Sequence, residues 1–111
     1  STYYASAPYF WTQITGTGLP NLTDTDYETL KNMYNEHRKA YFEVAEKLQW
    51  GVCNGLPLQF VLFKIAQLLQ WNSFAILCRL YTTVDHAQMA EEHWRLTCEH
   101  LGWEYIPTPA F

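Results

Sequence analysis

Apolar and aromatic residues recur at spacings of three and four in the first half of the chain, the pattern of one helix face. The run consists of Tyr27, Leu30, Tyr34, His37, Tyr41, Val44 and Leu48. Thr25 and Glu28 fit a capping box, in which two side chains satisfy two free amides at a helix start. Gly51 suits the end of the helix because glycine readily adopts left-handed backbone. The pattern predicts a long helix between Thr25 and Gly51, and a long helix with this seam also suits self-association.

A second helix is predicted from Pro57 to about Trp71, because proline is favoured in the first turn of a helix. One half of its surface is formed by Val61, Leu62, Ile65, Leu68 and Leu69. The other half mixes Gln59, Lys64, Gln67 and Gln70 with the rings of Phe60, Phe63, Trp71 and Phe74. A helix that is apolar nearly all round is either central or packed on both sides. We interpret the face with glutamines and rings as the better interface candidate.

The last stretch of helical spacing ends near Leu101, with Gly102 as its stop and Thr82, Thr83 or Asp85 as its N-cap. Its polar side carries Asp85, Gln88, Glu91, Glu92, Arg95 and Glu99. Its apolar side carries Ala87, Met89, Ala90, Trp94, Leu96, Cys98 and Leu101, together with His86, His93 and His100. We therefore expect the three histidines on the side of the helix that faces other protein.

The two ends of the chain lack helical periodicity. Residues 1–23 are rich in Tyr, Phe and Trp, which predicts an irregular arm, with a short strand around 9–14, rather than a disordered tail. Residues 103–111 contain Pro107 and Pro109, which predicts an extended tail pinned by Trp103, Tyr105 and Ile106. The fold class is thus all-α: a single domain over 1–111, with a compact bundle of three to four helices at 24–102.

Aromatic content is high for so short a chain. Five Trp, eight Tyr and six Phe make up 17% of 111 residues, more large rings than such a domain easily buries. Two interpretations remain open: a core filled with rings, or rings that reach the surface and mark contact sites.

Charge and cysteine usage narrow the classes of function. Eleven acidic against seven basic residues give a net charge of −4. Lys and Arg are scattered, whereas nucleic-acid binding normally requires a basic stripe, so no nucleic-acid partner is expected. The most apolar stretch, Leu56 to Tyr81, is interrupted by polar residues, so no membrane span is expected. Cys53, Cys78 and Cys98 are odd in number and show no CxxC spacing, which fits a reducing, cytoplasmic location.

The residues give little support for catalysis or metal binding. His86 and His93 are two helical turns apart, roughly 10–11 Å, too far to share one metal ion comfortably. We therefore expect neither a metal nor a cofactor. Cys53 lies in a glycine-flanked turn before a helix start, where partial positive charge lowers a thiol pKa. A small Cys/His enzyme or metal-site protein that uses Cys53 with a histidine is the alternative, although an inert buried cysteine is the commoner case.

His86, His93 and His100 have three interpretations. Each ring can hydrogen-bond a neighbouring carbonyl or carboxylate at the edge of the core, which is the simplest role. The three can form a second partner surface, because Met89, Leu96 and Trp103 continue the same seam. They can also act as a pH switch, since protonation of buried imidazoles costs stability.

The function that these features favour is protein–protein interaction. We expect a small acidic adaptor or inhibitor that docks on a larger protein assembly, with a homodimer as its own state. Accessory proteins of phages and mobile elements that inhibit a host system are of this kind. The candidate contact residues are Phe60, Phe63, Gln67, Trp71 and Phe74, followed by Tyr9, Phe10 and Trp11 in the arm.

Overall fold

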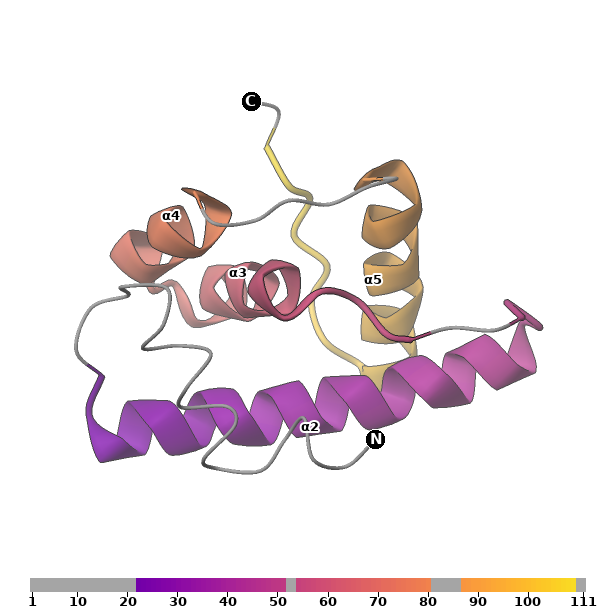
Figure 1. The fold of residues 1–111 in the computed structure, drawn as a ribbon, viewed down its shortest axis with the longest axis horizontal. Helices are drawn as coiled ribbons and strands as arrows, with labels where there is room; N and C mark the ends of the chain where they lie inside the picture. The colour runs from indigo at the N-terminus through magenta and orange to yellow at the C-terminus, as the bar shows by residue number, and fades with distance from the viewer. Residues whose placement is uncertain (1–21, 52–53, 81–86, 110–111) are drawn as a thin grey trace.

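In a computed structural model, residues 22–51, 54–80 and 87–109 are described, and they form four helices and no strand (Figure 1). The helices are α2 (Asp24–Lys47), α3 (Leu58–Leu69), α4 (Asn72–Leu80) and α5 (Ala87–Leu101). The prediction of an all-α fold with several helices is therefore confirmed. None of these helices combines the length and apolarity that crossing a membrane would take.

The long helix α2 is the base on which the other elements are arranged (Figure 1). It contacts both α3 and α5, and α4 packs against α3. After α5 the chain runs as an extended segment between α5 on one side and α3 and α4 on the other. The apolar seam of α2, which suggested self-association, is therefore covered by α3 and α5 of the same chain.

Helix α2 begins two residues before the predicted capping box. The Thr23 hydroxyl accepts the Asp26 amide at 3.0 Å, and the Asp26 carboxylate accepts the Thr23 amide at 3.3 Å. The predicted pair, Thr25 and Glu28, lies inside the helix, where Glu28 forms an ion pair with Lys31 at 3.2 Å. Both pairs have a threonine three residues before an acidic side chain, and the earlier one caps the helix.

Three helices end in the same way, at Leu-Gln-Trp, Leu-Gln-Trp and Leu-Gly-Trp. The middle residues are Gln49, Gln70 and Gly102, with φ of 57°, 61° and 77°. The tryptophan amides of Trp50, Trp71 and Trp103 then donate to the carbonyls of Ala45, Ala66 and Cys98 at 2.9, 3.0 and 2.9 Å. This is the Schellman pattern of helix termination. Gln49 rather than Gly51 thus ends α2, whereas the predicted stop at Gly102 is confirmed.

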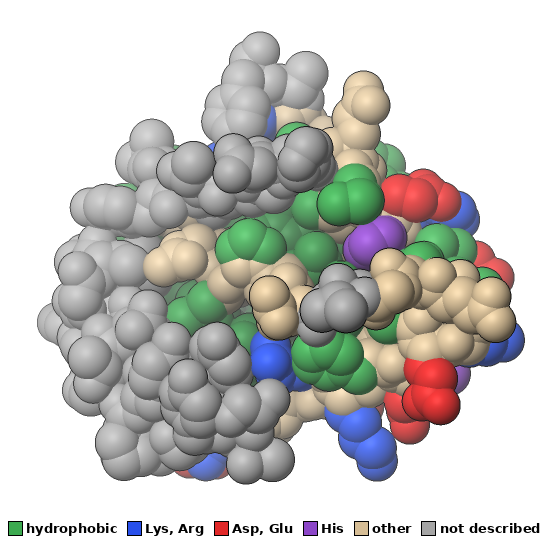
Figure 2. All heavy atoms as spheres, turned by 45° about the vertical axis from the view of Figure 1, so that its right-hand side comes forward, with side chains coloured by type: hydrophobic (Ala, Val, Ile, Leu, Met, Phe, Trp, Pro, Cys, Tyr) green, Lys and Arg blue, Asp and Glu red, His purple; other side chains and the backbone are tan. Residues whose placement is uncertain are grey.

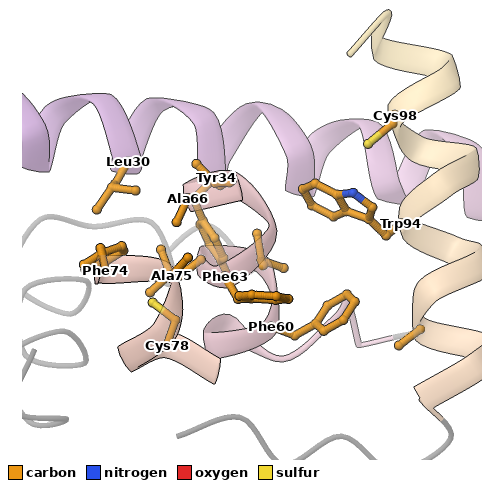
Figure 3. Packing of buried hydrophobic residues seen from close by; sticks show 14 residues of the cluster. Leu30, Tyr34, Phe60, Phe63, Ala66, Phe74, Ala75, Cys78, Trp94 and Cys98 are labelled. Atoms are coloured by element: carbon orange, nitrogen blue, oxygen red, sulfur yellow. The ribbon is translucent and has the colours of Figure 1, made fainter. Parts of the chain in front are cut away.

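The hydrophobic core is centred on α3. In Figure 3, Phe60, Phe63 and Ala66 of α3 lie between Phe74 and Cys78 of α4 and Trp94 and Cys98 of α5. The buried cluster consists of Leu30, Tyr34, Phe60, Val61, Leu62, Phe63, Ile65, Ala66, Phe74, Ala75, Cys78, Ala90, Trp94 and Cys98.

The choice of the ring-bearing half of α3 as an exposed contact face is wrong for three of its members. Phe60, Phe63 and Phe74 are only 5%, 5% and 4% exposed, and all three belong to the core cluster. The physical reason is that α3 is central and covered by neighbours on more than one side, which is the other arrangement that an all-round apolar helix allows.

Replacing Trp94 tests where the core lies. Trp94 is 1% exposed and contacts rings from α2 and α3, so Trp94→Ala is expected to lower the free energy of unfolding by about 3–5 kcal/mol in urea titrations. The matched control is Trp71→Ala, which removes a half-buried tryptophan at the rim and should cost clearly less. Equal losses for the two variants would contradict a core centred between α3 and α5.

Candidate functional site

Two members of the predicted contact set remain partly accessible. Gln67 and Trp71 lie near the C-terminal end of α3, both half-buried, and the Trp71 ring meets the Phe74 ring edge-on at 6.2 Å. Tyr9, Phe10 and Trp11 lie outside the described residues. Among the described members of the predicted set, only the two near the end of α3 are therefore partly accessible.

Two of the predicted histidines contact α2 or the segment just after it, and of these His100 is also exposed. The His93 ring stacks on Trp50 with centroids 3.6 Å apart, and its Nδ1 lies 3.3 Å from the Tyr41 hydroxyl. Burial lowers the pKa of His93, with partial compensation by neighbouring Glu92. His100 Nε2 lies 3.2 Å from a carboxylate oxygen of Glu43. These contacts join α5 to α2 and to the segment that follows it; His86 lies outside the described residues.

The fourth histidine, His37 of α2, is the most deeply buried. It is 2% exposed and stacks on Trp94 with centroids 4.6 Å apart. Within the described part of the chain its Nε2 has no hydrogen-bond partner. Burial, with a smaller contribution from Arg38, lowers its pKa to about 3. His37 is therefore a neutral ring of the α2–α5 contact near neutral pH.

The most concentrated polar cluster lies under the C-terminal tail, which we define as residues 103–109. At its centre is Lys64 of α3, whose side chain is 1% exposed. Its ammonium donates to the Ile106 carbonyl at 2.6 Å, the Thr108 hydroxyl at 2.8 Å and the Glu91 carboxylate at 3.2 Å. An ammonium group has three donors, so these contacts satisfy it completely.

Glu91 of α5 completes the cluster. One carboxylate oxygen accepts from the Tyr105 hydroxyl at 2.6 Å and the Thr108 amide at 3.2 Å, and the other accepts the Thr108 hydroxyl at 2.7 Å. Beyond it, the Arg79 guanidinium of α4 donates to the Pro109 carbonyl at 2.5 Å. Side chains of three helices thus hold the tail, partly through its main chain.

The electrostatics of this cluster favour an ion pair. Burial lowers the pKa of Lys64, and the Glu91 carboxylate opposes that shift. Burial acts to raise the pKa of Glu91, but the hydrogen bonds from Tyr105 and Thr108 together with Lys64 outweigh it, so the pKa falls. Burial and the bond to Glu91 raise the pKa of Tyr105 to about 12, so the phenol stays protonated and donates. The cluster holds the tail rather than supplying a reactive group.

Sequence reasoning missed this cluster. It assigned Lys64 to a mixed helix face and Glu91 to the polar side of the last helix, where charges usually face solvent. The available signal was a single lysine in an otherwise apolar helix, followed by a tail with hydroxyl groups at Tyr105 and Thr108. The prediction that the tail is extended and pinned is confirmed, and Tyr105 is one of its contacts.

Neither described cysteine is an activated nucleophile. Burial raises the pKa of Cys78 to about 12 and that of Cys98 to about 11, with both thiols in the core. Cys53, the residue on which the alternative function depends, lies outside the described residues. Among those residues, no three His, Cys, Asp or Glu side chains are grouped to hold a metal ion.

The largest exposed hydrophobic side chains of the described segments are Ile76 of α4, Met89 of α5 and Leu48 at the end of α2. They are 62%, 54% and 45% exposed. Figure 2 shows one face of the molecule on which hydrophobic side chains gather beside a histidine, with acidic side chains along one border. Ile76, Met89 and Leu48 are accessible to a partner, unlike the buried rings of α3.

A sequence profile of the family described as poxvirus late transcription factor VLTF3-like matches residues 1–105. The profile covers most of the chain, so the chain belongs to this family. No curated protein and no solved structure matches it. The family is named for a poxvirus protein, which agrees with the expected phage or mobile-element accessory protein only in its viral character; inhibition of a host system stays a prediction.

Replacing Glu91 tests the cluster under the tail. Glu91→Gln weakens the bonds to Lys64, Tyr105 and Thr108, and it should lower the free energy of unfolding by about 1–3 kcal/mol in urea titrations. The matched control, Glu92→Gln, alters an exposed ion pair with Arg95 on the next position of α5 and should change little. If both variants unfold like the wild-type chain, Glu91 does not hold the tail.

The buried His37 predicts acid sensitivity. The folded pKa of His37, about 3, lies below the unfolded value of 6.5. Its contribution to the free energy of unfolding is therefore complete above pH 6.5 and is lost as the pH falls toward 3. The loss is about 1.4 kcal/mol per pH unit, or about 2 kcal/mol between pH 7.5 and 5.0. Protonation of His93 acts in the same direction.

Urea midpoints at these two pH values measure the effect. His37→Phe keeps a ring against Trp94 but cannot be protonated, so it should lose less than half as much stability as the wild-type chain. His100→Gln, at an exposed position of the same helix contact, is the control that should retain the full loss. Identical acid losses in His37→Phe and the wild type would show that His37 does not cause them.

Proposed function

We propose that this member of the poxvirus late transcription factor VLTF3-like family is a protein-docking module that acts in viral late transcription by binding a protein of the transcription apparatus. The observation that carries the proposal is the family match over residues 1–105. The charge of the chain supports a protein partner rather than DNA, because its net charge is −4 and its basic residues are scattered. A cytoplasmic location belongs to the same proposal.

The contact surface that we propose is formed by exposed apolar side chains on α4 and α5. Ile76 and Met89 are each more than half exposed, and burial of such side chains contributes to association. The rings of Phe60, Phe63 and Phe74 are occupied in the core and take no part. Partly buried Gln67 and Trp71 belong to the edge of the surface at most.

Direct binding measurements test this function. The immobilised full chain is exposed to the purified RNA polymerase and to each late transcription factor of the virus that encodes it, and separately to a late-promoter DNA duplex at 50 mM salt. We expect one of the proteins to bind. Ile76→Asp and Met89→Asp should weaken that binding about tenfold or more, because each buries a charge at the contact.

Matched controls separate the surface from the fold. Ser73→Asp on α4 and Gln88→Asp on α5 place the same charge at exposed polar positions of the same helices, and both should bind like the wild-type chain. Binding to the DNA duplex without binding to any protein would overturn the proposal. Binding to a protein that Ile76→Asp and Met89→Asp leave unchanged would overturn the assigned surface.

Two other functions have distinct outcomes. An inhibitor of a host system would bind none of the viral transcription proteins. A homodimer through α2 is disfavoured, because the apolar seam of α2 is buried within one chain. Light scattering of the purified protein measures its mass and therefore distinguishes a monomer from a dimer. The alternative of a Cys53 enzyme stays a prediction, because Cys53 lies outside the described residues.

A further inference from the structure

We call the three side chains that bind the main chain of the tail, Lys64, Arg79 and Glu91, the groove. Lys64 donates to the carbonyl of Ile106, Arg79 donates to the carbonyl of Pro109, and Glu91 accepts the amide of Thr108. These side chains come from α3, α4 and α5, and the tail runs between α5 on one side and α3 and α4 on the other (Figure 1). Recognition of main-chain groups along an extended segment is how many domains bind linear peptides.

The tail also carries the sequence features of such a peptide. Pro107 and Pro109 restrict it to extended conformations, which lowers the entropy lost on binding. Two side chains add specificity, because the hydroxyls of Tyr105 and Thr108 both donate to Glu91. A ligand of this groove is therefore an extended segment with tyrosine three residues before a threonine that is flanked by prolines.

The root of the tail is held by contacts that are separate from those of the residues after it. Trp103 remains in the ring contacts at the end of α5, where its centroid lies 6.2 Å from Trp94 and 6.4 Å from His37. The next residue, Glu104, is exposed, and the contacts with the groove begin at Tyr105. The part that can be displaced is therefore residues 105–109.

We propose that the groove of Lys64, Arg79 and Glu91 is a peptide-binding site whose resident occupant is the chain's own tail, and that a proline-containing segment of a protein partner binds by displacing it. The site rests on the contacts above, whereas the assignment of the partner to viral late transcription rests on the proposed function. The buried ammonium of Lys64 needs hydrogen-bond acceptors from whichever segment lies over it. The tail should therefore be replaced by the partner segment as a unit, without an intermediate that leaves Lys64 uncovered.

A synthetic peptide tests the site on the full chain. The probe is a fluorescent peptide with the sequence of residues 104–111, and binding is followed by anisotropy. The wild-type chain should bind it weakly, because a tethered tail competes at an effective concentration on the order of millimolar. A chain with Tyr105→Phe and Thr108→Val in its own tail holds that tail less tightly, so it should bind the peptide about tenfold more tightly or better.

Three controls make the result decisive. Glu104→Gln changes an exposed tail residue outside the contacts and should bind the probe as the wild type does. Adding Glu91→Gln to the tail variant should remove the gain, with circular dichroism used to verify that the chain remains helical. A probe with the same Tyr-to-Phe and Thr-to-Val changes should bind the tail variant at least tenfold more weakly.

If the tail variant binds the peptide no better than the wild type does, the tail is a permanent part of the fold and the proposal fails. It also fails if the altered probe binds equally well, because the hydroxyl groups would then not be recognised. The assay contains no transcription protein. Peptide binding can therefore be found even if the proposed function fails, and the proposed function can hold even if no peptide binds.

Discussion

A buried ammonium group must have all of its donors satisfied, and much of this structure follows from that requirement at Lys64. Its side chain is 1% exposed, and isolated charges are very costly to bury. Two of its three acceptors belong to the tail and the third belongs to α5. The position of the tail is therefore determined by α3 and α5 together, and the lysine cannot keep its place if the tail leaves and nothing replaces it.

The sequence predicted the faces of helices better than it predicted their neighbours. The three-four seam of α2 identified Leu30, Tyr34 and Val44, all of which are buried. The same periodicity could not show that α4 would cover the second half of α3, because spacing reports which side chains face protein and not which protein they face. For this reason Phe60 and Phe63 were assigned to an interface and lie in the core.

Helix termini show a second limit of sequence reasoning. Composition favours glycine as the residue that ends a helix, yet Gln49 and Gln70 adopt the left-handed conformation and Gly102 is the only glycine of the three. The common feature is the tryptophan that follows, whose amide bonds back into the last turn while its ring packs toward the protein. Repetition of Leu-x-Trp at three sites was visible in the sequence, but its meaning required backbone geometry.

Among the described residues, aromatic rings join α5 to α2 and α3, close to the cluster that holds the tail. His93 and Trp94 of α5 contact α2 and its end, whereas Glu91, less than one turn away, holds the tail. Acid acts on the contacts between α5 and α2 through His37 and His93, whereas a competing peptide acts on the contacts between Glu91 and the tail. Burial lowers the pKa of His37 and His93, and its hydrogen-bond partners and Lys64 lower the pKa of Glu91, so near neutral pH the imidazoles are neutral while the carboxylate is charged.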